Sequence, residues 1–172
     1  MTGLGAAGGD GTDWDRFASS YPEPFGALSG LVAAAWAEGD PVLLELARLR
    51  TATLLRYDAE RGRRSARARA AGLTEAKVAE LPAWPTSPLF TPRERACLAL
   101  AEQFVIDAAG VTDSLVVGVT DHLGAEGCYA FVQALSVLET FQRACLTLGI
   151  DSAPEVDELV AAGAATTPEA RR

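Results

Sequence analysis

The chain has little of the chemistry that metal sites and disulfide-bonded folds require. His122 is the only histidine among 172 residues, and the three cysteines, Cys97, Cys128 and Cys145, lie far apart without a C-x-x-C pair. This scarcity argues against a zinc site. An odd number of isolated cysteines with apolar neighbours is typical of small buried side chains rather than of a disulfide framework. We therefore expect no metal ion and no other cofactor.

Long apolar runs and export signals are also missing. No apolar run approaches the roughly 20 residues of a membrane-spanning helix. The first residues, MTGLGAAGGDG, lack the basic region and apolar block of a secretion signal. The net charge is −8 and the isoelectric point is near 4.7, which disfavours DNA and anionic lipid as partners. We expect a cytoplasmic protein that binds neither nucleic acid nor membrane.

The periodicity that is present is helical, and no segment shows strict two-residue alternation between turn signals. Asp40 followed by a proline, and the Thr91-Pro-Arg-Glu94 capping box, predict two helix starts, while Gly124 and Gly149 predict breaks. The fold class is therefore all-α. Helices are predicted over residues 25–39, 42–55, 74–81, 93–110, 111–123 and 125–149.

The distribution of small and apolar residues predicts the domain boundaries. The glycine-rich start predicts a disordered or irregular leader over residues 1–20, followed by a single all-α domain over 21–163 and a frayed tail over 164–172. The segment from Cys128 to Leu148 is apolar around most of its girth. Such a helix is expected at the centre of the fold or at a subunit interface, which favours a homo-oligomer.

Three segments follow one another in a recognisable order: ELARLRTATLL, a short polar insert, and ARAAGLTEAKVAELPAWPTSPLFTPRERACLALAEQF. This order resembles the carboxymuconolactone decarboxylase family, specifically its alkylhydroperoxidase D-like branch, and the similarity runs from about Leu43 to Gly149. Members are small all-α proteins that assemble as trimers, or as hexamers built from them. The resemblance therefore implies an alkylhydroperoxidase D-like helical bundle and a homo-trimer or hexamer.

The redox motif of that branch is lost here. Redox members carry C-x-x-C-x-x-x-H just before the A-R-A-A-G segment, and an upstream glutamate that relays protons. By ungapped alignment the cysteines fall on Tyr57 and Glu60 and the histidine on Arg64, while the glutamate is retained as Glu45. Peroxide reduction needs a thiolate and a second thiol, so residual peroxidase or peroxiredoxin-like activity is the least favoured interpretation.

One interpretation of the altered motif is an enzyme that uses acid–base chemistry without thiols. On a continuous helix Glu60 and Arg64 would form an i, i+4 ion pair. Glu60, Tyr57 and Glu45 are the candidate catalytic residues, and Arg64 and Arg61 the candidate substrate-binding residues. A lyase or isomerase that decarboxylates, isomerises or eliminates from a small carboxylate-bearing substrate would fit these residue types. Glu45 and Glu60 can cooperate only if the helix breaks between them, or through a neighbouring subunit.

The alternative interpretation is a catalytically inactive oligomer that binds a ligand or a protein partner. The segment LLRYDAERGRRSARARAAG carries six arginines, which are then a solvated face or a set of salt bridges. Glu139 and Arg143 are expected to form a buried structural pair, and His122 to pack or cap near a helix end. Burial separates the two interpretations. Catalysis needs a closed, partly apolar cavity at Tyr57, Glu60 and Arg64, whereas a saturated salt-bridge network or an open surface favours the inactive form.

Overall fold

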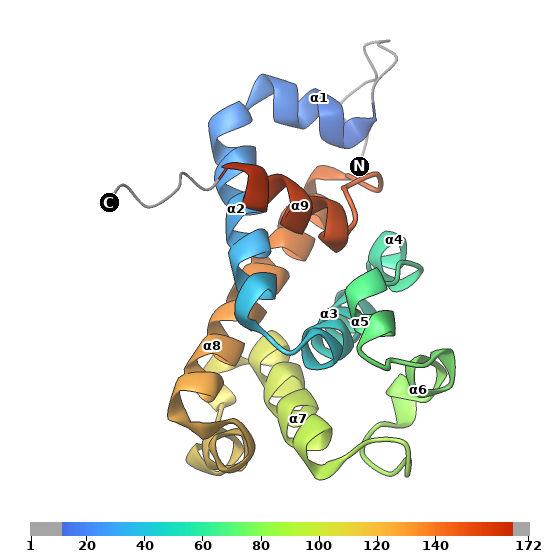
Figure 1. Cartoon of the computed structure of the whole chain (residues 1–172), viewed down its shortest axis with the longest axis vertical. Helices are drawn as coiled ribbons and strands as arrows, with labels where there is room; N and C mark the ends of the chain where they lie inside the picture. The colour runs from blue at the N-terminus through green and yellow to red at the C-terminus, as the bar shows by residue number, and fades with distance from the viewer. Residues whose placement is uncertain (1–11, 167–172) are drawn as a thin grey trace.

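The computed structural model describes residues 12–166, and every regular element in that range is helical, which confirms the all-α class. No helix in this range is both long and apolar enough to cross a membrane. The elements, shown in Figure 1, are α1 (Asp13–Ser20), α2 (Pro22–Glu38), α3 (Pro41–Leu55), α4 (Asp58–Arg61), α5 (Ala66–Ala70), α6 (Glu75–Ala79), η1 (Leu81–Ala83), α7 (Pro92–Ile106), η2 (Ala108–Gly110), α8 (Asp113–Leu148) and α9 (Val156–Thr166).

The predicted helix starts are confirmed. The Asp40 carboxylate accepts hydrogen bonds from the first free N–H groups of α3, and Pro41 occupies the first helical position. Thr91 and Glu94 form the predicted capping box at the start of α7. These local signals fix where α3 and α7 begin.

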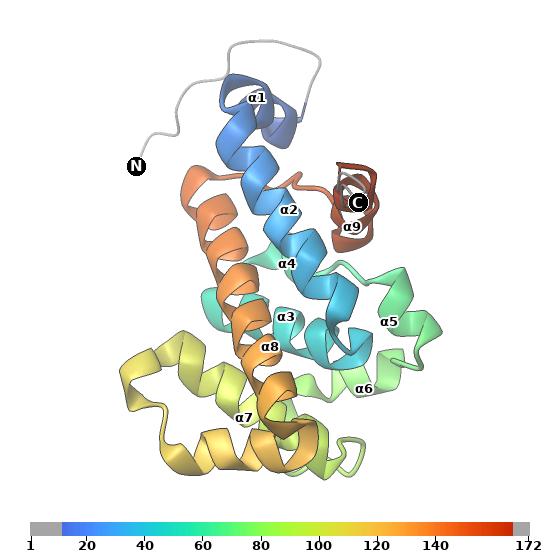
Figure 2. The same cartoon turned by 60° about the vertical axis from the view of Figure 1, so that its left-hand side comes forward.

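Helix α3 lies at the centre of the fold. It contacts both α7 and α8, while α2 packs along the second limb of α8 and against α9 (Figure 2). Every residue from Leu43 to Leu49 is buried, including Glu45 and Arg48. The stretch is apolar except for those two ions, so α3 carries opposite charges into the interior of the protein.

Two segments at the ends of the described range differ from the prediction. Residues 13–20 form α1 rather than an irregular leader, because Thr12 and Asp15 make a capping box and Trp14 packs against Phe25 and Phe141. Helix α9 is absent from the predicted elements, and it extends to Thr166, into the range expected to fray. The rest of the predicted leader and tail, residues 1–11 and 167–172, lies outside the described part.

The predicted break at Gly124 is confirmed within α8. Gly124 has φ of +73° and ψ of 171°, a conformation that essentially only glycine adopts. The limb before Gly124 and the limb after it run in different directions (Figure 2). The predicted stop is also confirmed, because Gly149 has φ of +69° and ends the second limb.

Candidate functional site

The helix does not continue through the altered motif. Arg56 adopts a left-handed conformation with φ of +58°, and the N–H of Tyr57 donates to the carbonyl of Ala52 at 2.9 Å, which closes α3. Helix α4 begins at Asp58 and is only four residues long. Of the two possibilities that the sequence leaves open, a continuous helix and a break, the structure has the break, so Tyr57, Glu60 and Arg64 do not share one helix face.

The break brings two carboxylates onto one buried arginine, Arg48, which is not among the residues predicted for the site. Arg48 donates to both carboxylate oxygens of Glu45 at 2.8 Å. Its Nη1 donates to the carboxylate of Glu60 and to the Glu60 carbonyl at 3.1 Å, and its Nη2 also reaches the Arg63 carbonyl at 3.0 Å. A guanidinium has five N–H donors, and all five of Arg48 are used.

Further contacts complete this cluster of Glu45, Arg48, Glu60 and Arg63, named below the Arg48 network. Arg63 Nη1 donates to Glu60 at 3.0 Å, and the N–H of Ser65 donates to Glu45 at 3.0 Å. Glu45, Arg48 and Glu60 are 0%, 3% and 4% exposed. Two carboxylates thus balance two guanidinium groups, which is the condition under which buried charges are tolerated.

Pairing keeps the central arginine charged. Burial by itself would lower the pKa of Arg48, but the hydrogen bonds and charge of Glu45 and the charge of Glu60 outweigh it and raise that pKa above its ordinary value. A permanently charged, fully bonded Arg48 leaves both glutamates anchored as acceptors. The arrangement is a saturated salt-bridge network, the outcome expected for a structural role.

Tyr57 is buried and its hydroxyl donates to the carbonyl of Ile150. Burial, and to a smaller extent the negative charge of Glu60, raise the pKa of the phenol above its usual value. The side chain therefore joins the α3–α4 break to the segment that follows α8, with its proton engaged by the main chain.

The side chains of the two predicted substrate-binding arginines make no hydrogen bond to the side chains of Glu45, Tyr57 or Glu60, although Arg64 lines a small cavity beside Glu60. Arg64 Nε donates to Glu75 at 3.2 Å, and Arg61 Nη1 donates to Asp58 at 2.7 Å. The predicted Glu60–Arg64 ion pair is therefore wrong, because the turn after α4 directs Arg64 toward α6 while Glu60 points into the core.

Arg61 and Arg64 line a cavity of about 430 Å³, named here the arginine cavity. Its polar wall comes from α4, the turn after it and α6, and its apolar wall from α3, α6 and η1. Glu45, Tyr57 and Glu60 are not among its lining residues. The lining residues are Leu49, Thr53, Asp58, Arg61, Gly62, Arg64, Glu75, Val78, Ala79, Leu81 and Pro82.

The cavities beside Glu60 are much smaller. Two of them adjoin Arg48 and Glu60, and each offers about 10 Å³, which is room for about one water molecule. One is also lined by Gln142, whose buried Oε1 has no hydrogen-bond partner among the described residues. A small organic substrate needs a cavity of roughly 300 Å³ or more. These two cavities cannot bring such a substrate to Glu60.

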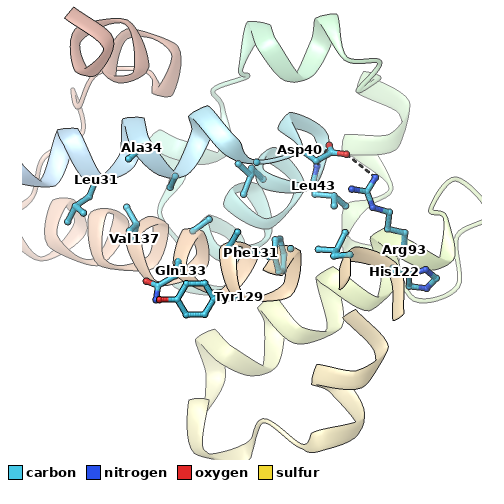
Figure 3. Close-up of a pocket in the computed structure, with 17 residues that line it drawn as sticks. Leu31, Ala34, Asp40, Leu43, Arg93, His122, Tyr129, Phe131, Gln133 and Val137 are labelled. Carbon is cyan, nitrogen blue, oxygen red and sulfur yellow. Dashed lines mark hydrogen bonds and ion pairs between the residues drawn. The ribbon is translucent and has the colours of Figure 1, made fainter. Parts of the chain in front are cut away.

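A larger cavity of about 540 Å³ lies between α2, the start of α3 and α8, and is named here the α2–α8 cavity (Figure 3). It contains none of the predicted site residues. His122, expected to pack or cap, lines it and is exposed. The apolar walls come mainly from α2, the start of α3 and the second limb of α8, which are distant in the chain, so no single local motif indicates the cavity.

The remaining predictions concern thiols, a surface pair and metals. Burial raises the pKa of Cys97 and of Cys145 to about 12, which leaves both thiols protonated near neutrality. Glu139 and Arg143 do pair at 2.7 Å, but Arg143 is 51% exposed, so the pair is not buried. Among the described residues no group of three or more His, Cys, Asp or Glu side chains is arranged to hold a metal ion.

Comparison with known proteins supports the resemblance seen in the sequence. Residues 22–103 match the Carboxymuconolactone decarboxylase family. The chain is also similar to a solved structure of a protein of unknown function from Agrobacterium tumefaciens, proposed to be the antioxidant defence protein AhpD. That match has a TM-score of 0.66 and 22% identity over 81% of this chain and 96% of the other. At this identity it establishes the fold alone. No curated protein matches.

Proposed function

We propose that this chain, a member of the carboxymuconolactone decarboxylase family, binds a small carboxylate-bearing organic molecule in the arginine cavity and carries out no thiol redox chemistry. One observation carries the proposal: Arg61 and Arg64 line the same cavity of about 430 Å³. The residues aligned with the family's redox cysteines, Tyr57 and Glu60, are instead buried and bonded within the protein.

Both arginines retain donors for a ligand. Arg61 uses only Nη1 in hydrogen bonds to the described residues, and Arg64 uses Nε and Nη1, so each keeps an unengaged Nη2 group. A carboxylate that accepts from both would form charge-assisted hydrogen bonds, which are stronger than neutral ones.

The neighbouring acids set the strength of that binding. Asp58 and Glu75 line the same cavity and balance the two guanidinium charges. The hydrogen bond from Arg64 lowers the pKa of Glu75, so Glu75 is ionised near neutrality and competes with a ligand for the arginine. We therefore expect the cavity to bind a carboxylate through directed hydrogen bonds together with contacts to the rest of the ligand, rather than through charge alone.

The opposite wall selects the body of the ligand. Leu49, Val78, Leu81 and Pro82 are the main apolar groups of the lining. An aromatic or compact aliphatic group placed against them would be removed from contact with water, which favours binding by about 25 cal/mol per Å² of apolar surface buried. An aromatic monocarboxylate such as benzoate combines both features.

The Arg48 network supports a structural rather than a catalytic role for Glu45 and Glu60. Each glutamate is anchored by a guanidinium in the core, and neither reaches the arginine cavity. Acid–base catalysis at Glu60 would require a rearrangement that opens this network. We therefore assign the altered motif to scaffolding, with the ligand on the other side of α4.

Calorimetric titration of the full chain with benzoate tests the proposal, with benzamide as the uncharged control. Arg64→Gln and Arg61→Gln should each weaken benzoate binding by about tenfold or more, since a hydrogen bond to a charged group contributes about 1.5–3 kcal/mol. Arg67→Gln is the matched control, because Arg67 is an exposed arginine outside the cavity. Equal affinity for benzamide, or equal loss in the control, would refute the proposal.

The family is typically oligomeric, and we propose a homo-trimer or hexamer for this chain as well. The apolar second limb of α8 carries exposed large side chains outside the α2–α8 cavity, including Leu146 and Leu148. Sedimentation equilibrium would give the assembly mass directly, and a monomer at micromolar concentration would contradict the proposal.

A further inference from the structure

The α2–α8 cavity is separate from the arginine cavity, and its volume of about 540 Å³ falls in the range of small-molecule sites. Its walls are mostly apolar, with Leu43, Phe131 and Val137 among them (Figure 3). Leu31 and Tyr129 stand at its rim and are 55% and 69% exposed. An apolar molecule entering this space would remove both its own surface and these side chains from water.

The arginine and the histidine of the cavity lie together at one end, whereas Gln133 and Tyr129 bring an amide and a hydroxyl elsewhere along the lining (Figure 3). In Figure 3 Arg93 and His122 lie at the end near the start of α3, far from Leu31. Arg93 Nη1 donates to Asp40 at 3.0 Å, and no hydrogen bond to the described residues uses its Nε or Nη2. His122 makes no side-chain hydrogen bond within the described residues, and an imidazole carries at least one N–H donor in either charge state.

The one acid at this end is already occupied. Asp40 accepts from the N–H groups of Val42 and Leu43 at 2.9 and 3.2 Å with one oxygen, and from Arg93 with the other. Its charge is therefore largely compensated by partners that hold it in place. The groups left for a ligand at this end are N–H donors, which match an anionic head.

We propose that the α2–α8 cavity binds an amphipathic carboxylate, a molecule with an acid head at Arg93 and His122 and a hydrocarbon body along α2 and α8. This inference goes beyond the proposed function, because it concerns a second site with a different ligand class. A molecule of this kind accepts hydrogen bonds from the unengaged donors and covers the apolar walls. A purely apolar ligand would leave the donors without an acceptor, and a small anion would leave the apolar walls exposed to water.

Titration with decanoate tests the inference, with decanol as the control that lacks the acid. Arg93→Gln should weaken decanoate binding by about tenfold or more. It should leave decanol binding and benzoate binding unchanged. Conversely, Arg64→Gln should leave decanoate binding unchanged, so failure of one site is distinguishable from failure of the other.

Filling the apolar part of the cavity gives an independent measurement. Ala34 and Ala130 line the cavity and are exposed, so Ala34→Trp and Ala130→Trp should each abolish decanoate binding while the circular dichroism stays that of the parent. Ala27→Trp, on the same helix as Ala34 but outside the lining, is the matched control and should bind normally.

Three results would overturn the inference. These are no decanoate binding by the parent chain, binding that persists in both filled variants, and binding weakened by Arg64→Gln instead of Arg93→Gln. In the first case, a loss of assembly mass in Ala34→Trp would show that a second copy of the chain occupies this surface instead.

Discussion

Arg48 donates to the carboxylate and to the main-chain carbonyl of Glu60, twelve residues further along the chain. This buried, charged side chain thereby links α3 to α4 across the break between them. The same guanidinium holds Glu45 one turn earlier on α3. Buried ion pairs thereby hold in place the segment aligned with the redox motif.

Replacing that arginine should test its structural role. Arg48→Met leaves two buried carboxylates without their partner, and should lower the free energy of unfolding by about 3–5 kcal/mol in urea denaturation. Arg143→Met removes a half-exposed pair and should cost less than about 1 kcal/mol. Equal costs for the two variants would show that the Arg48 network contributes no more than a surface pair.

Removing the charge of Glu60 separates scaffolding from catalysis. Glu60→Gln should leave the assembly mass and the benzoate affinity unchanged, because Glu60 does not line the arginine cavity. The free energy of unfolding should fall by about 1–3 kcal/mol, since Arg48 and Arg63 lose a charged acceptor. Discovery of a turnover that this variant abolishes, with the fold intact, would restore the acid–base interpretation.

The buried thiols predict a pH dependence. The pKa values of Cys97 and Cys145 rise from 9.0 to about 12 on folding, so the folded chain retains protons that the unfolded chain releases between these values. This contribution to stability is fully present below pH 9 and is lost as the pH rises toward 12. The free energy of unfolding from urea denaturation should therefore be lower at pH 10.5 than at pH 8. Cys97→Ala should reduce this difference.

The same burial predicts chemical inertness. In the folded chain the three cysteines should resist a disulfide reagent at pH 8, and all three should react after unfolding in urea. Rapid reaction of the native protein, or peroxide consumption coupled to a reversible disulfide, would contradict the proposal that the chain carries out no thiol redox chemistry.

The break in α8 can be tested by adding one methyl group. Gly124→Ala should cost about 1–3 kcal/mol, because φ of +73° with ψ of 171° is a backbone conformation that alanine avoids. Gly118→Ala is the matched control: that glycine is helical and a Cβ there meets nothing within 4 Å. It should stabilise the protein by about 0.5–1 kcal/mol. A neutral Gly124→Ala would mean that the break is not imposed by the backbone.

Local signals in the sequence determined most of the fold. The caps at Asp40 and Thr91 and the breaks at Gly124 and Gly149 act within a few residues, so the order of residues alone is enough to recognise them. The loss of the cysteine pair is equally visible, because it depends on residue identity alone. Helix α1 has a recognisable capping box at Thr12, but the glycine-rich residues before it mask that signal.

The site depended on geometry that the sequence does not contain. Arg56 ends α3 with a positive φ, which an arginine seldom adopts, so the sequence leaves open whether the helix continues and places Arg64 beside Glu60 or breaks. Arg48 lies in an apolar stripe with Glu45 as its one nearby partner, three residues earlier, and only packing brings Glu60 to it. The sequence by itself determined most of the helices and the lack of a C-x-x-C pair. The tertiary structure decided which charges are buried as partners and which face a cavity, because those contacts join segments distant in the chain.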